Sequence, residues 1–285
     1  MGQSVRPINR DILNMEGSNN LIEQILPQFV GIDISSFRAG DRTNVFRFMP
    51  IPRAVGRLGI FAAEKGGVER AVIMLLPEKA RADGILICIT QGFQQAAGTL
   101  DALGWANPLS YKHVHYALLK HVINRWGLQT LASRKNLGLM YILRARGNEL
   151  GPFAADGPFL QFVLEEIKNL TNNSFSYDTC EAFTFSSGIH DFNPFMRAAS
   201  GNVNIKSVYA IDPVHSMIPV NPNGGRVKVY SSGTAGAIGP MSEPMVLERW
   251  QNEPAYDTPE KNDKFMYLHN RCMPWYVLGL ALGTP

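Results

Sequence analysis

Short apolar runs alternate with longer segments of helical periodicity from residue 85 onward, and this rhythm restricts the fold more than any other feature of the sequence. The runs predicted to be strands are residues 85–90, 137–143, 182–185, 205–211 and 226–230. The segments predicted to be helices are residues 111–126, 159–170 and 192–199. Strands that are joined through helices run parallel, with right-handed crossovers that place helices on both faces of the sheet. The sequence therefore predicts an α/β fold with a mostly parallel central sheet.

Before residue 85 the sequence predicts short strands joined by short turns, without intervening helices. Residues 45–49, 58–62 and 71–76 are β-rich runs separated by short turns such as Glu64-Lys65-Gly66-Gly67, and links this short favour antiparallel strands. Residues 1–44 are polar and irregular, and we expect them to form an N-terminal arm packed on the core. Since 285 residues suit one large α/β domain, we expect residues 45–285 to form a single domain.

Composition narrows the classes of function. The net charge is only +3, with no run of five like charges, so we expect no nucleic-acid partner. The three cysteines, Cys88, Cys180 and Cys272, are too far apart for a disulfide framework or a zinc site. The histidines of the 111–126 helix lack the i, i+4 spacing with which a helix holds a metal. We therefore expect neither a metal nor a cofactor.

The ends of the chain bear on location. Residues 1–10 have no apolar segment after their charges, so no secretory signal is recognised. The apolar run at residues 275–282 is too short to cross a bilayer. These features, together with unpaired cysteines, favour a cytoplasmic protein without a transmembrane segment, and they leave the oligomeric state open.

A serine follows the apolar run at residues 182–185. The order Thr184-Phe185-Ser186-Ser187-Gly188 places Ser186 between a strand and a helical segment. This pattern resembles the Gly-x-Ser-x-Gly nucleophile elbow of the α/β-hydrolase superfamily, with Thr184 in place of the first glycine. Two alternatives remain open here: an ordinary Ser-Ser-Gly turn at a strand end, and Ser187 as the nucleophile.

The resemblance also implies an oxyanion hole. In α/β-hydrolases the loop after the first buried parallel strand often reads His-Gly-x and lends a backbone N–H to the developing charge. The matching loop here is Gln91-Gly92-Phe93-Gln94. The resemblance makes the N–H groups of Phe93 and Ser187 the expected oxyanion donors, and it places Gln91, Gly92 and Gln94 next to the substrate.

An acid and a base complete the expected site. Asp212 follows the run at residues 205–211 directly and precedes Pro213, as in some lipases of the superfamily. His269 lies just before the last apolar segment, and no histidine lies between it and His215. The order Ser186, Asp212, His269 is that of the α/β-hydrolase triad.

Two further segments are expected near the substrate. His190 follows the serine closely enough to line a pocket, although it is also placed to point away along the new helix. Residues 234–264 are rich in methionine, proline and acidic residues, and we expect them to form a lid that admits an apolar acyl chain.

The resemblance thus implies a serine hydrolase of the esterase or lipase type. Its substrate would be a small molecule or acyl ester, thioester or amide, cleaved through an acyl-enzyme on Ser186. Two alternatives remain. One is a non-catalytic protein that keeps the fold for binding, and the other is an acyltransferase with the same triad.

Overall fold

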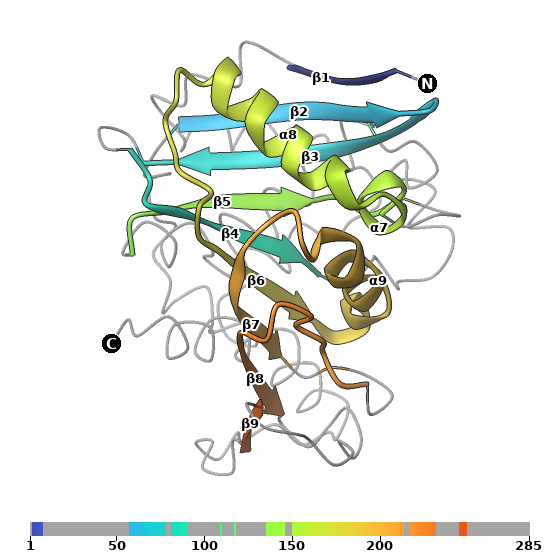
Figure 1. Ribbon diagram of the computed structural model, residues 1–285, viewed down its shortest axis with the longest axis vertical. Helices are drawn as coiled ribbons and strands as arrows, with labels where there is room; N and C mark the ends of the chain where they lie inside the picture. The colour runs from blue at the N-terminus through green and yellow to red at the C-terminus, as the bar shows by residue number, and fades with distance from the viewer. Residues whose placement is uncertain are drawn as a thin grey trace, which may run out of the picture.

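The computed structural model describes residues 2–7, 57–77, 81–90, 109, 117, 135–145, 150–211, 213, 217–231 and 245–249. Their centre is a nine-stranded sheet in the order β1-β2-β3-β5-β4-β6-β7-β8-β9 (Figure 1). The strands are β1 (Gln3–Pro7), β2 (Arg57–Lys65), β3 (Val68–Leu76), β4 (Gly84–Ile89), β5 (Leu137–Ile142), β6 (Cys180–Phe185), β7 (Ile205–Ile211), β8 (Arg226–Ser231) and β9 (Met245–Arg249). Every strand predicted from residue 58 onward is present.

The sheet begins antiparallel and continues parallel. β1, β2, β3 and β5 pair antiparallel in turn, whereas β5, β4, β6, β7, β8 and β9 all run in one direction. The β2–β3 hairpin closes through Gly66 and Gly67, whose φ angles of 62° and 81° suit the two-residue turns that join antiparallel strands. The predicted fold class, a mostly parallel α/β sheet with antiparallel N-terminal strands, is confirmed.

Two strands were not predicted. β1 lies within the segment expected to be an irregular arm, and it pairs with β2 from Gln3↔Lys65 to Pro7↔Phe61. Val5 is the side chain of β1 that packs against the core. The alternation of apolar and polar residues along β1 is therefore too weak to indicate a strand. β9 lies within residues 234–264, so this part of the expected lid belongs to the sheet instead. The rest of that segment lies outside the described residues, as do the predicted strand at 45–49 and, except for the helical Ala117, the predicted helix at 111–126.

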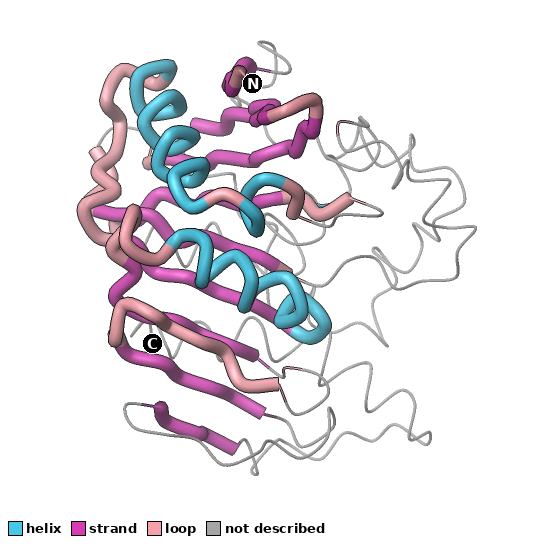
Figure 2. Tube along the Cα trace, turned by 45° about the vertical axis from the view of Figure 1, so that its right-hand side comes forward, coloured by secondary structure: helices cyan, strands magenta, loops and turns pink. Residues whose placement is uncertain are grey.

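Three described helices lie together on one face of the sheet (Figures 1 and 2). They are α7 (Pro152–Ala155), α8 (Gly157–Leu170) and α9 (Ile189–Ala199). The face of α8 that meets the sheet is Phe159, Leu160, Val163, Leu164 and Ile167, all buried. Phe159 packs edge-on against Phe153 of α7, with ring centroids 4.9 Å apart. The core therefore lies between this helix layer and the apolar strands.

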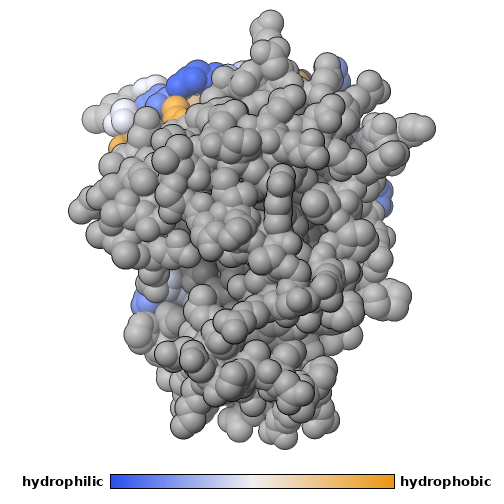
Figure 3. Space-filling model, turned by 180° about the vertical axis from the view of Figure 1, so that it is seen from behind, coloured by the Kyte–Doolittle hydropathy of each residue, from blue (hydrophilic) through white to orange (hydrophobic). Residues whose placement is uncertain are grey.

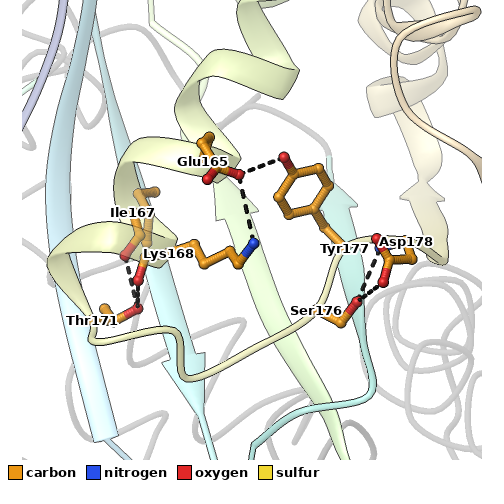
Figure 4. A network of polar contacts seen from close by, with 7 residues as sticks. All are labelled: Glu165, Ile167, Lys168, Thr171, Ser176, Tyr177 and Asp178. Atoms are coloured by element: carbon orange, nitrogen blue, oxygen red, sulfur yellow. Dashed lines mark hydrogen bonds and ion pairs between the residues drawn. The ribbon is translucent and has the colours of Figure 1, made fainter.

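A polar network fixes the connection from α8 to β6 (Figure 4). The Tyr177 hydroxyl donates to Glu165 Oε2 at 2.6 Å, and the Lys168 ammonium lies 5.3 Å from the centre of the Tyr177 ring. At the end of α8 the Ile167 carbonyl accepts from both the backbone N–H of Thr171 at 2.9 Å and its hydroxyl at 2.7 Å. Burial and the Glu165 hydrogen bond raise the pKa of Tyr177 to about 12. Because this connection enters β6, the network lies at the amino end of the parallel strands.

The described residues expose few large hydrophobic side chains. Among the described residues, the exposed large hydrophobic side chain is that of Leu170, which is 47% exposed. The described residues visible from behind are mostly hydrophilic (Figure 3). Among the described helices, none combines the length and the apolar character that crossing a bilayer requires. Cys88 and Cys180 are buried free thiols, and burial raises the pKa of both.

Candidate active site

Ser186 occupies a strained corner at the carboxyl end of β6. The strand ends at Phe185, a single 3-10 turn (η4, Ser186–Gly188) follows, and α9 begins at Ile189. The φ angle of Ser186 is 54°, in the left-handed region that costs a non-glycine residue about 1 kcal/mol. A strained serine between a strand and a helix is the defining geometry of a nucleophile elbow.

The same backbone separates Ser186 from Ser187. Ser187, unlike Ser186, does not have a positive φ angle. Its hydroxyl oxygen is buried and has no hydrogen-bond partner among the described residues. Ser187 is the second residue of η4, at the N-terminal end of the helix that follows, where N–H groups have no partner within the helix. This position suits an N–H donor better than a nucleophile.

The packing of Gly188 against Thr184 explains how Thr184 can replace the first glycine of the Gly-x-Ser-x-Gly motif. A Cβ on Gly188 would lie 2.7 Å from the Thr90 carbonyl carbon and 2.9 Å from the Ile89 carbonyl oxygen, so position 188 has no room for a side chain. A Cβ on Gly188 would also lie 3.0 Å from Thr184 Oγ1. The Thr184 side chain therefore lies against Gly188, fully buried, and its hydroxyl has no partner among the described residues. Threonine is accommodated at the first position of the motif because the glycine at the last position leaves space for it.

The register of the sheet brings the ends of three strands to one level. Phe185 pairs with Ile211, so Ser186 and Asp212 follow residues that are paired on adjacent parallel strands. Ile89 pairs with Thr184, which places the end of β4 beside the same corner. Adjacent strands are about 4.8 Å apart. Asp212, His269 and the loop of Gln91, Gly92, Phe93 and Gln94 themselves lie outside the described residues.

A partly buried ion pair lies beside the corner, and the sequence does not predict it. Arg144 follows β5, and its Nη2 atom pairs with Asp191 Oδ2 in the first turn of α9. Arg144 Nη1 also donates to the Thr90 carbonyl oxygen at 3.5 Å. Burial raises the pKa of the Asp191 carboxyl, and the Arg144 charge opposes that rise. No motif signals this pair, because its two members come from distant parts of the chain and meet only in the fold.

His190 is the remaining predicted site residue that the structure describes. It lies on the first turn of α9 and is exposed. Its charge lowers the pKa of the neighbouring Asp191, although burial of Asp191 outweighs this effect. Within the described ranges no group of three or more histidine, cysteine, aspartate or glutamate side chains is arranged to hold a metal ion.

The strand order gives an α/β-hydrolase-like fold, and the left-handed serine lies at the corner between β6 and α9 where such a fold can present a nucleophile. Neither a protein-family model nor a curated protein sequence matches this chain.

Several solved structures are similar to it. An arylesterase matches 79% of this chain and 80% of its own, at 11% identity and a TM-score of 0.37. A thermostable carboxylesterase from a metagenomic library matches 72% of this chain and 57% of its own, at 13% identity and a TM-score of 0.39. An S-formylglutathione hydrolase from Agrobacterium tumefaciens matches 69% of this chain and 87% of its own, at 12% identity and a TM-score of 0.38.

Proposed function

We propose that this protein is a serine hydrolase that cleaves a carboxylic ester, thioester or amide through an acyl-enzyme on Ser186. The observation that carries the proposal is the left-handed backbone of Ser186 at the end of β6. Strain of this kind persists where the surrounding structure enforces it, and it clusters at catalytic residues. A binding scaffold without chemistry has no need for a strained serine at this corner.

Asp212 and His269 would complete the triad. A serine hydroxyl is a weak nucleophile, so His269 takes its proton during attack and returns it to the leaving group. Asp212 holds the imidazole tautomer and stabilises the imidazolium. The pairing of Phe185 with Ile211 supports the choice of Asp212, because the residues that follow a pair on adjacent parallel strands leave the sheet at the same level.

The oxyanion hole would be formed by the backbone N–H groups of Phe93 and Ser187. The place of Ser187 in η4 supports its role, because N–H groups at the start of a helix point toward negative charge. The contact of Gly188 with the end of β4 supports the role of the loop that follows, because it brings the two backbones together. Gln91, Gly92, Gln94 and His190 would contact the substrate around these donors.

The substrate would be a small-molecule or acyl ester. An acyltransferase with the same triad differs only in the acceptor, so product analysis with and without an added alcohol separates the two activities. Residues 234–264, apart from β9, remain the proposed source of a lid over the acyl chain.

A series of para-nitrophenyl esters, from acetate to laurate, tests the proposal. The wild-type protein should hydrolyse at least one member, and S186A should lower kcat by about 10⁴-fold or more. D212N and H269A should lower kcat by about 10⁴-fold, whereas S187A should lose much less because its proposed donor is the backbone. Hydrolysis that survives S186A would overturn the proposal. Failure of every ester, with Ser186 also unreactive, would favour the binding scaffold.

A further inference from the structure

Thr90, the last described residue before the Gln91–Gln94 loop, is held at both of its oxygen atoms. Its side chain is 1% exposed, and its hydroxyl hydrogen-bonds to the Tyr141 hydroxyl. Its carbonyl oxygen accepts from Arg144 Nη1. Both partners belong to β5 or to the residues that follow it, so the neighbouring strand fixes the end of β4.

Arg144 also reaches the other side of the corner. Its second terminal nitrogen pairs with Asp191, and the two side chains are only 11% and 20% exposed. Asp191 lies in the first turn of the helix that Ser186 introduces. One guanidinium thus joins the end of β4 to the start of α9, and a planar fork with several fixed donors suits this double contact, whereas a single ammonium does not.

Stability alone is a poor explanation for this pair. Both side chains are partly buried, so the cost of removing their charges from water offsets much of the attraction between them. The Asp191 carboxyl keeps a raised pKa even with Arg144 beside it, because burial dominates. The pair therefore calls for a role in geometry.

We propose that Arg144 is a positioning residue: by joining the Thr90 carbonyl to the Asp191 carboxylate, it holds the backbone that leads into the oxyanion loop at a fixed distance from the nucleophile corner. This rests on the proposed function, in which the loop after Thr90 and the start of α9 each supply an N–H donor. Arg144 acts through these two backbones and makes no contact with substrate. A small shift of either donor relative to Ser186 weakens stabilisation of the transition state more than binding of the ground state.

The test compares R144K with the wild type and with R197K as a matched control, because Arg197 is an exposed arginine on α9. For R144K we expect kcat to fall by roughly tenfold to a hundredfold with KM nearly unchanged, and R197K should match the wild type. D191N is a second variant that changes no volume. Because Arg144 and Asp191 act as one unit, R144K/D191N should be hardly slower than R144K alone.

Amide hydrogen exchange gives a readout that does not depend on activity. In R144K, exchange should accelerate in the peptides that cover residues 85–94 and 186–192, and it should stay unchanged in peptides that cover β2 and β3. R197K should show no change in any of these peptides.

Two results would overturn the inference. The first is R144K with wild-type kcat and wild-type exchange around Thr90. The second is R144K with a raised KM and an unchanged kcat, which would make Arg144 a substrate-binding residue. If the wild type neither hydrolyses esters nor reacts at Ser186, the proposed function fails, and the exchange experiment still decides whether Arg144 fixes the two backbones.

Discussion

Gly188 lies so close to Thr90 that a methyl group on its Cα would come within 2.7 Å of the Thr90 carbonyl carbon. This contact joins the corner that follows β6 directly to the end of β4. The backbone around Ser186 and the end of β4 are therefore in direct contact.

Replacing Gly188 by alanine should damage both the fold and the site. The atoms that the new Cβ meets belong to the backbone of Ile89 and Thr90, so no side-chain rotation relieves the clash. We expect G188A to lower the free energy of unfolding by about 1 to 3 kcal/mol, as overpacked positions do, and to lower kcat further. Urea denaturation and ester hydrolysis measure the two effects. G2A is the control, because nothing lies within 4 Å of a Cβ at Gly2; equal stability of G188A and G2A would contradict the contact.

The strain at Ser186 predicts an unusual order of stabilities. Glycine adopts a φ of 54° freely, whereas alanine pays the same backbone cost as serine. S186G should therefore be more stable than S186A by about 1 kcal/mol, although both lack the hydroxyl and both should be inactive. Thermal and urea denaturation of the pair measure this difference. An S186A variant as stable as S186G would mean that the backbone at this residue is not left-handed.

Asn193 on α9 should stabilise the segment after Asp212. Its side-chain amide donates to the Ile218 carbonyl at 2.9 Å and accepts from the Val220 N–H at 3.0 Å. Asn193 is buried, so N193A leaves two backbone groups without their partner, and we expect a loss of about 2 kcal/mol in the free energy of unfolding.

N204A is the control for this prediction. The Asn204 side chain also donates to a backbone carbonyl, that of Asp178 at 3.3 Å, but it is exposed. Water replaces an exposed partner, so the loss should be well below that of N193A. Equal losses in the two variants would show that the Asn193 contacts do not stabilise the segment.

Tyr177 should make the protein sensitive to alkali. In the folded state its pKa is raised to about 12, mainly by burial and then by the Glu165 hydrogen bond. In the unfolded state the pKa of tyrosine is about 10. The folded state therefore holds the proton more tightly, and this contribution is complete below about pH 10 and is lost as the pH rises toward 12. Over this range the stability of the wild type should fall more steeply than that of Y177F. Parallel curves of unfolding free energy against pH would contradict the assignment.

Much of the fold is predictable from sequence because buried parallel strands leave a strong pattern. β4 and β5 are nearly continuous apolar runs, and both lie wholly inside the sheet. β1 was missed because an edge strand buries few side chains and so has little periodicity. The sequence around β9 is rich in proline and methionine and therefore predicts a lid, whereas in the structure the segment pairs with β8 and forms a strand.

The candidate site likewise contains residues that the sequence predicts and residues that it does not. Ser186 was predictable because the strand, the serine and Gly188 are contiguous, so one local pattern carries the geometry. The role of Thr184 was not, since its place depends on the space that Gly188 leaves beside β4. The Arg144–Asp191 pair was equally hidden, because a contact between segments that are distant along the chain leaves no spacing to read. Asp212 and His269 remain predictions that the described residues do not test.

Labelling with a fluorophosphonate, followed by peptide mapping, tests the central claim most directly. This reagent phosphonylates a serine only where a base and an oxyanion hole activate the hydroxyl. We predict one modification per chain, on Ser186, which is absent from S186A and from heat-denatured protein and persists in S187A. Modification of Ser187 in place of Ser186, or no modification of the folded wild-type protein, would contradict the account.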